Sequence, residues 1–248
     1  MAQRAHHSNK VIRTVKKQSL KMKVVYEDNH IIIVSKASGE IVQGDKTGDR
    51  PLSETVKDYI KERYGKPGNV FLGVVHRLDR PVGGLVVFAK TSKALARLNE
   101  MLRVGDIHKT YWAVTPRRDI APTGRIVSWL TRNERQNKSY AHDREVPQSK
   151  KAELEYEVIA ATDRYMLLEI NLLTGRHHQI RCQLAHMGCA IKGDLKYGAP
   201  RSNPDGSISL LSRRVSFVHP VSHTEVKVEA DVPEDALWQA LAKGVRRR

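Results

Sequence analysis

One short run of the sequence places an aspartate between two arginines. The run His76-Arg77-Leu78-Asp79-Arg80 lies between two apolar segments, residues 70–75 and 85–90, so a turn between two strands is expected to hold it. Positive charge on both sides keeps a carboxylate ionised, and an ionised Asp79 could act as a nucleophile, a base or a metal ligand. A structural ion pair that holds the turn is an equally good interpretation of these residues.

A second candidate site lies where a strand ends at Thr174-Gly175 and a helix is expected over residues 177–187. Helix N-termini attract phosphates, and Arg176 would strengthen that attraction. Arg181 falls in the first turns of this helix, from which it could point back toward the sheet. The alternative is a capped helix whose basic residues are simply solvated.

A third candidate is Tyr111, which opens an expected strand over residues 110–115. A phenol can exchange a proton or donate a hydrogen bond. A single tyrosine is nevertheless more often core or surface filler than a catalyst, so its position alone does not assign it a role.

Net charge indicates the kind of partner. The chain has 43 Lys and Arg against 27 Asp and Glu, a formal charge of +16, and the excess is present at both ends and in the middle. A protein this basic usually binds a polyanion, most often nucleic acid, although a well-solvated surface is the simpler alternative. Composition does not distinguish RNA from DNA, or an enzyme from a binding protein.

Cysteine usage and the chain ends indicate an intracellular protein. Cys182 and Cys189 are too far apart for common zinc motifs and lie in an apolar-periodic segment, so we expect reduced cytoplasmic thiols in or near a core. No apolar run is long enough to cross a bilayer, and no secretory signal is evident. Residues 1–23 carry seven Lys or Arg and no acid, which predicts a flexible basic arm, and residues 246–248 are similar.

Apolar periodicity predicts the elements that must position these residues. Strands are expected at residues 24–26, 30–35, 70–75, 85–90, 110–115, 153–160, 165–172, 208–211, 215–218 and 225–229. Helices are expected at 53–64, capped by Ser53, from 92 to about 102, capped by Ser92, and at 177–187 and 233–242. Residues 117–151 read as an irregular excursion of strands and loops. Strands outnumber helices without regular strand–helix alternation, which predicts an α+β fold on a large, mostly antiparallel sheet.

The three candidate sites together resemble the motifs of the RluA-type pseudouridine synthases. Four motifs in the right order carry this resemblance, which covers roughly residues 24–230 and is highly specific. They are Ile31–Lys36 with Ser38-Gly39 (opening strand and turn); His76–Pro81 with Gly84–Thr91 (signature motif); Lys109–Tyr111 (tyrosine motif); and Leu173–Arg176, His178–Arg181, Gly188, Ile191, Gly193-Asp194 and Tyr197-Gly198 (arginine motif).

The sequence departs from the family pattern in three places. His177 stands where a threonine is usual, and Val82-Gly83 replaces a common Thr-Ser pair. The chain is also expected to lack the small N-terminal RNA-binding domain of many relatives, which leaves a catalytic domain over residues 24–245 made of two closely joined subdomains. These departures affect the expected substrate and not the expected reaction.

The resemblance implies a pseudouridine synthase-like fold with helices flanking the sheet and a central catalytic cleft. It implies that Asp79 attacks the ribose or removes a ribose proton, that Arg181 pairs with Asp79, and that Tyr111 helps to remove the C5 proton of uracil. Arg77 is expected to fill the stack that the flipped nucleotide leaves. The residues expected to bind substrate are His76, Arg77, Arg80, Arg176, Gln179 and Lys192.

The implied partner is RNA, with ribosomal RNA slightly favoured over transfer RNA. No cofactor, metal or membrane is implied, and the expected state is a cytoplasmic monomer. Two alternatives stay open: an RNA-binding protein that kept the scaffold without catalysis, and a metal-dependent nuclease that uses His76, Asp79 and Asp194.

Overall fold

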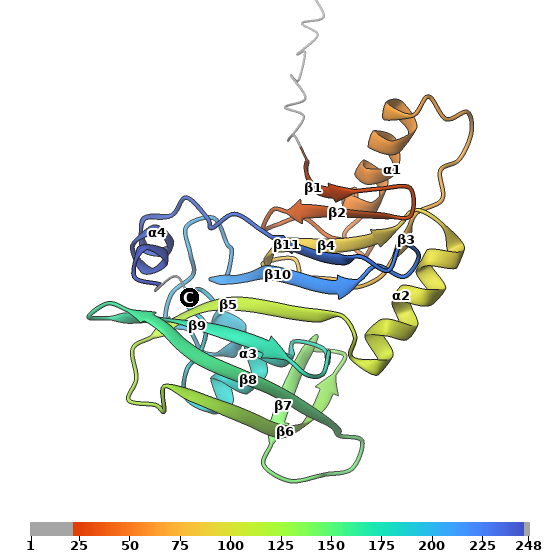
Figure 1. Ribbon diagram of the computed structural model, residues 1–248. Helices are drawn as coiled ribbons and strands as arrows, with labels where there is room; N and C mark the ends of the chain where they lie inside the picture. The colour runs from red at the N-terminus through yellow and green to blue at the C-terminus, as the bar shows by residue number, and fades with distance from the viewer. Residues whose placement is uncertain (1–21, 246–248) are drawn as a thin grey trace, which may run out of the picture.

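The computed structural model describes residues 22–245, in which eleven strands form one curved sheet (Figure 1). Of the basic arm predicted over residues 1–23, residues 1–21 lie outside the described part, as do the arginines at 246–248. The strands are β1 (Lys23–Glu27), β2 (Ile31–Lys36), β3 (Gly73–Val74), β4 (Gly83–Ala89), β5 (His108–Pro116), β6 (Thr123–Asn133), β7 (Lys138–His142), β8 (Lys150–Ala161), β9 (Tyr165–Leu172), β10 (Leu210–Val218) and β11 (Glu225–Glu229).

The strand order is β1-β2-β4-β10-β5-β9-β8-β6-β7, with β3 beside β4 and β11 beside β10. All neighbours are antiparallel except β4 and β10, which run parallel at Gly83 and Gly84. The prediction of an α+β fold on a mostly antiparallel sheet is therefore confirmed. Because β10 comes late in the chain and pairs with β4 and β5, the sheet joins segments that are far apart in sequence.

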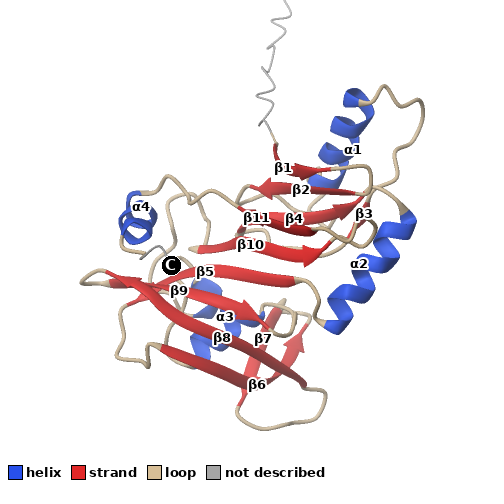
Figure 2. Cartoon of the chain, in the orientation of Figure 1, coloured by secondary structure: helices blue, strands red, loops and turns tan. Residues whose placement is uncertain are grey.

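Helices cover both faces of the sheet (Figure 2). They are α1 (Leu52–Arg63), α2 (Ser92–Val104), α3 (Gln179–His186) and α4 (Ala236–Lys243), with a short 3₁₀ turn at Leu195–Tyr197. On one face α1 and α3 bury residues such as Val56 and Leu184 against the sheet. On the other face α2 and α4 bury residues such as Leu98 and Trp238.

This two-sided cover explains the continuous apolar runs in the central strands. In β2, Ile32 and Val34 face one core while Ile31 and Ile33 face the other, and all four are fully buried. A strand that is covered on both faces needs apolar residues at every position and not at alternate ones. Cys182 and Cys189 are both buried and free, as predicted.

The largest local difference from the sequence prediction is at residues 117–151. They contain a regular hairpin in which β6 has 11 residues, and not an irregular excursion. Only Ser128 and Leu130 of β6 are buried, because this strand lies near the edge of the sheet. The weak apolar pattern therefore reflects the strand's position and not a lack of regular structure.

Other differences concern the ends of elements. The strand predicted at residues 70–75 is reduced to β3, and the strands predicted at 208–211 and 215–218 are one strand, β10, with an irregularity between Ser212 and Arg214 that interrupts its alternation. Thr91 and not Ser92 caps α2, accepting a hydrogen bond from the amide of Ala94. Ser53 does not cap α1 as predicted, because it lies inside the helix and Pro51 occupies the N-cap position. No helix in the described part is long and apolar enough to span a membrane.

Candidate active site

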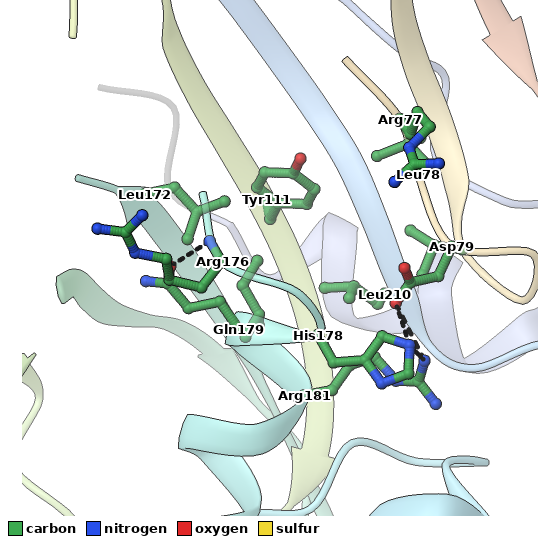
Figure 3. Close-up of a pocket in the computed structure, with 12 residues that line it drawn as sticks. Arg77, Leu78, Asp79, Tyr111, Leu172, Arg176, His178, Gln179, Arg181 and Leu210 are labelled. Carbon is green, nitrogen blue, oxygen red and sulfur yellow. Dashed lines mark hydrogen bonds and ion pairs between the residues drawn. The ribbon is translucent and has the colours of Figure 1, made fainter. Parts of the chain in front are cut away.

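A pocket opens where the turn before β4, the middle of β5 and the start of α3 meet (Figure 3). It contains all three residues predicted to be catalytic, and three of the six predicted to bind substrate. The lining residues are Arg77, Leu78, Asp79, Val82, Tyr111, Leu172, Arg176, His178, Gln179, Ile180, Arg181 and Leu210. His76, Arg80 and Lys192 do not line it.

The side chain of Lys36 holds the turn that carries Asp79 through hydrogen bonds to its backbone. This side chain is almost fully buried, and its Nζ donates to the carbonyl oxygens of Ala37, Arg80 and Val82 at 2.9, 3.1 and 2.6 Å. Burial lowers the pKa of Lys36 to about 8, although the nearby carboxylates of Glu40 and Asp79 act in the opposite direction. The lysine is therefore still mostly protonated at neutral pH and can fill this donor role.

A close approach of two strands fixes the other side of the turn. Gly84 has φ +110°, and a Cβ there would collide with the backbone of Ser212 on β10. A side chain is excluded both by this backbone conformation and by the neighbouring strand. Glycine at this position lets β4 and β10 pair directly after the turn that carries Asp79.

Arg181 lies between two aspartates. Its Nε and Nη2 donate to the two carboxylate oxygens of Asp194 at 2.7 and 2.8 Å, and its Nη1 donates to Oδ2 of Asp79 at 3.0 Å. Arg181 and Asp194 are 5% and 1% exposed, whereas the Asp79 side chain is 32% exposed. Burial alone would lower the pKa of Arg181, but Asp194 and Asp79 outweigh it and raise this pKa further. Arg181 therefore stays positively charged between the two carboxylates.

Asp79 is the solvent-exposed member of the three ion-paired residues Asp194, Arg181 and Asp79. Its Oδ2 lies 3.0 Å from Arg181 and 3.4 Å from Nε2 of His178, and no residue within 22–245 is hydrogen-bonded to its Oδ1. One carboxylate oxygen is thus held in place while the other is left available in the pocket. This arrangement suits a carboxylate that acts as a nucleophile or a base.

His178 is a site residue that the sequence prediction of roles missed. Its Nε2 lies 3.1 Å from Arg181 Nη1, which can only donate, so the ring proton is on Nδ1 and faces the hydroxyl of Tyr197 at 3.0 Å. Burial lowers the pKa of His178 to about 3, so the ring is neutral. Its backbone has φ 51°, an uncommon conformation for a residue other than glycine, just before α3 begins. The helix therefore starts at Gln179 and not at His177 as predicted.

Asp194 and Tyr197 complete the support of Arg181. Both are buried, and the Arg181 guanidinium lies 5.1 Å from the centre of the Tyr197 ring. They lie within the stretch that matched the arginine motif, which was the signal available in the sequence. Their contact with Arg181 follows from the fold and could not be read from spacing.

Tyr111 reaches the pocket from β5 and is buried. Burial raises its pKa to about 12, and the negative charge of Asp79 acts in the same direction. The phenol therefore keeps its proton at neutral pH. It can pack against a ligand or donate a hydrogen bond, but it is not a phenolate base in this environment.

Among the predicted substrate-binding residues in the pocket, two are exposed cations and one is a buried support. Arg77 is exposed, and its side chain makes no hydrogen bond or ion pair within residues 22–245, while Arg176 donates through Nε to the carbonyl of Lys151 at 3.0 Å. Gln179 is buried: its Oε1 accepts from Thr174 and from the amide of Arg176, at 2.8 and 2.9 Å. Its amide thus holds the segment that carries Arg176.

The three residues outside the pocket have partners elsewhere. The Nε2 of His76 accepts a hydrogen bond from the amide of Val87 at 3.2 Å, and burial lowers the pKa of this histidine to about 3. Arg80 pairs with Asp49 at 2.7 Å in an exposed loop. Lys192 donates to the side chain of Asn203 at 2.6 Å. Each contact gives its residue a structural role, and the binding of substrate by His76, Arg80 and Lys192 stays a prediction.

The nuclease alternative is not supported by this arrangement. His76 is bound to the β4 backbone, and both carboxylate oxygens of Asp194 are taken by Arg181. Within residues 22–245, no three His, Cys, Asp or Glu side chains form a group that could hold a metal ion.

Comparison with known proteins identifies the family. A family model described as RNA pseudouridylate synthase matches residues 30–186. The ribosomal large subunit pseudouridine synthase D of Xanthomonas campestris pv. campestris is 30% identical over 234 residues, which cover 88% of this chain and 68% of that protein. A Bacillus subtilis protein named uncharacterized RNA pseudouridine synthase YhcT is 32% identical over 222 residues, covering 86% and 69%.

Solved structures show the same fold. Human RNA pseudouridylate synthase domain containing 4 superposes with a TM-score of 0.72 at 20% identity, covering 90% of this chain and 92% of that one. Human RNA pseudouridylate synthase domain containing 1 gives 0.67 at 18% identity, covering 89% and 87%. The predicted pseudouridine synthase fold is confirmed, and the chain belongs to the RNA pseudouridylate synthase family, a family of isomerase enzymes.

Proposed function

We propose that this protein isomerises chosen uridines of structured RNA to pseudouridine, and that ribosomal RNA is its substrate rather than transfer RNA. The observation that carries the proposal is the row of ion pairs from the buried Asp194 and Arg181 to Asp79, which ends in one open carboxylate oxygen in the pocket that Tyr111 also lines. The net charge of +16 suits an RNA substrate, and several similar proteins are named as ribosomal large subunit pseudouridine synthases.

In the proposed reaction, the C1′–N1 bond of uridine breaks and a C1′–C5 bond forms. N1 gains a proton and C5 loses one, so the reaction needs neither an electron donor nor an acceptor. Asp79 starts the reaction either by adding to C1′ or by removing a proton from the ribose. Both routes use an ionised carboxylate, which the neighbouring guanidinium of Arg181 stabilises. A primary isotope effect from deuterium on the ribose would support proton removal, and its absence would support addition.

Tyr111 is proposed to act as a neutral phenol. Because its pKa is raised to about 12, it holds the freed uracil and steers a water molecule toward the C5 proton, and does not take that proton as a phenolate. Its position on β5, within the same pocket as Asp79, supports this role.

Arg77 and Arg176 are proposed to bind the RNA around the target nucleotide. Both are exposed at the pocket, and in the view of Figure 3 they lie on either side of Tyr111. Uridine must leave its stack to reach Asp79, and the planar guanidinium of Arg77 suits the space that it leaves. We also propose that residues 24–245 act as one catalytic unit of two closely joined halves, in a monomer that works in the cytoplasm.

The test is release of tritium from RNA labelled at uridine C5, using RNA from cells that lack this protein. Wild-type protein is expected to release tritium from ribosomal RNA, and Asp79→Asn to release none while its RNA affinity stays within a few-fold. Asp49→Asn is the matched control, because Asp49 also pairs with an arginine but lies outside the pocket.

Substantial release by Asp79→Asn would contradict the role of Asp79. Release from transfer RNA alone would correct the substrate. RNA binding by wild-type protein without release from either RNA would favour the non-catalytic alternative.

A further inference from the structure

Lys109 is a basic residue beside the pocket that the proposed reaction does not use. It lies on β5, two residues before Tyr111, so both side chains leave the same face of the strand. Its Nζ is 3.7 Å from the position that a Cβ would take at Gly175, next to Arg176. The ammonium group therefore reaches the exposed segment between β9 and α3, at the edge of the pocket.

The ammonium group of Lys109 has no partner in the described part of the chain. No hydrogen bond or ion pair is found for it within residues 22–245. The side chain is partly buried, and this burial lowers its pKa. Its charge also adds to the burial that lowers the pKa of His76. A desolvated cation without a counter-charge is unfavourable, so this position favours an added anion.

The surroundings supply positive charge and no spare negative charge. Among the described residues, the side chain of Arg77 has no partner, and the side chain of Arg176 donates only to a backbone carbonyl. Asp79 is the single carboxylate among the residues that line the pocket, and Arg181 already pairs with it. Three cations around the pocket are thus left without an acidic partner in this part of the structure.

We propose that Lys109 binds a phosphodiester group of the RNA strand next to the target uridine, so that the substrate supplies the missing counter-charge. The inference rests on the proposed function for the identity of the ligand. The exposed backbone at Gly175 leaves the ammonium open to a phosphate on that side. Lys109 would then position the RNA strand so that the target uridine lies near Tyr111, while Arg77 and Arg176 contact the RNA from the pocket edge.

The first test measures the affinity of a fluorescein-labelled RNA stem-loop with a uridine-rich loop, at several salt concentrations. We expect Lys109→Met to bind about tenfold more weakly, as for the loss of one charged hydrogen bond. The slope of log affinity against log salt should also fall by about 0.7, because one phosphate contact is lost. Lys109→Arg should restore most of both.

Lys93→Met is the matched control. Lys93 is exposed on α2, which packs on the opposite face of the sheet, so its loss should change neither affinity nor slope. A Lys109→Met protein that keeps the wild-type slope would overturn the proposal.

A second measurement uses the wild-type fold, in case Lys109→Met does not fold. The lysines are converted to ¹³C-dimethyl-lysine, the Lys109 signal is assigned by its absence in Lys109→Arg, and its pKa is followed by NMR. Binding of the stem-loop should raise this pKa, because a phosphate stabilises the charged form. An unchanged pKa with RNA bound would overturn the proposal, and an equal rise with inorganic phosphate alone would show a small-anion site instead. If the RNA effects appear but no tritium is released, the phosphate site stands and the proposed function fails.

Discussion

Two clusters of arginine and carboxylate lie on opposite faces of the sheet. Tyr111 and Trp112 are neighbours on β5 and face opposite sides of the sheet. On the Tyr111 side, Arg181 is buried between Asp194 and Asp79. On the Trp112 side, Arg213 stacks over the indole at 4.8 Å, and Arg213 and Arg214 both pair with Glu229 at 2.7 Å.

The two clusters differ in solvent access and in the use of their charges. The side chains of Arg214 and Glu229 are 28% and 38% exposed, so water screens their pairing. Arg181 and Asp194 are almost fully buried, so their geometry is held strongly and the charge of Arg181 reaches Asp79 with little screening. Connected ion pairs can therefore serve as a candidate catalytic site when some of them are buried, as Arg181 and Asp194 are, and one carboxylate stays open to solvent, as Asp79 does.

The largest effect is expected from removing the inner carboxylate. Asp194→Asn would leave the buried guanidinium of Arg181 with Asp79 as its only acidic partner among the described residues. We expect the free energy of unfolding to fall by about 3 kcal/mol, measured by urea denaturation, and tritium release to drop sharply. A loss below about 1 kcal/mol would mean that burial does not distinguish this cluster from the exposed one.

A somewhat smaller effect is expected from Lys36→Met, which removes the donor that holds the turn of Asp79. The carbonyls of Ala37, Arg80 and Val82 would lose this partner, at a cost of about 2 kcal/mol in unfolding free energy. Activity is expected to fall through kcat while RNA affinity is kept, since Lys36 lies below the turn. Wild-type single-turnover rates in this variant would show that the turn is positioned without it.

Acid is expected to destabilise the fold through His76 and His178, two histidines that burial keeps neutral. The pKa of His76 and of His178 is about 3 in the folded protein, against an ordinary value of 6.5. As pH falls from 6.5 toward 3, the unfolded chain takes up a proton at each histidine that the folded chain does not. The free energy of unfolding should therefore fall by about 1.4 kcal/mol per pH unit for each.

The measurement is urea denaturation at a series of pH values below 6.5. His178→Gln removes one of the two groups. The slope of its unfolding free energy against pH should therefore be smaller than that of the wild type, by the amount that corresponds to about one proton. The same steepness in both proteins would mean that His178 is not held neutral.

The smallest effect is expected on the exposed side. Glu229→Gln removes the carboxylate that pairs with Arg213 and Arg214, but these pairs are screened by water. The unfolding free energy should change by about 0–1 kcal/mol, and tritium release should stay at the wild-type level. A loss as large as that of Asp194→Asn would remove the distinction between the two clusters.

Much of the fold was predictable because its signals are local. The hairpin of β8 and β9, the strand β11 and the central strands β2 and β4 follow from apolar runs and turn residues that are close in sequence. The regular strand β6 was missed because it lies near the sheet edge and buries few residues. The single strand β10 was missed because an irregularity interrupts its alternation.

The sequence by itself determined which segments carry the candidate site, since four motifs in order contain Asp79, Tyr111 and Arg181 and resemble those of a known family. Only the tertiary structure decided their contacts. Arg181 and Asp79 are 102 residues apart in sequence. They meet because only β10 and β5 lie between β4, which follows the turn of Asp79, and β9, which leads into α3. The support of Arg181 by Asp194 and the unpaired ammonium of Lys109 arise in the same way. Burial and charge pairing depend on which distant segments pack together, and residue spacing does not encode that.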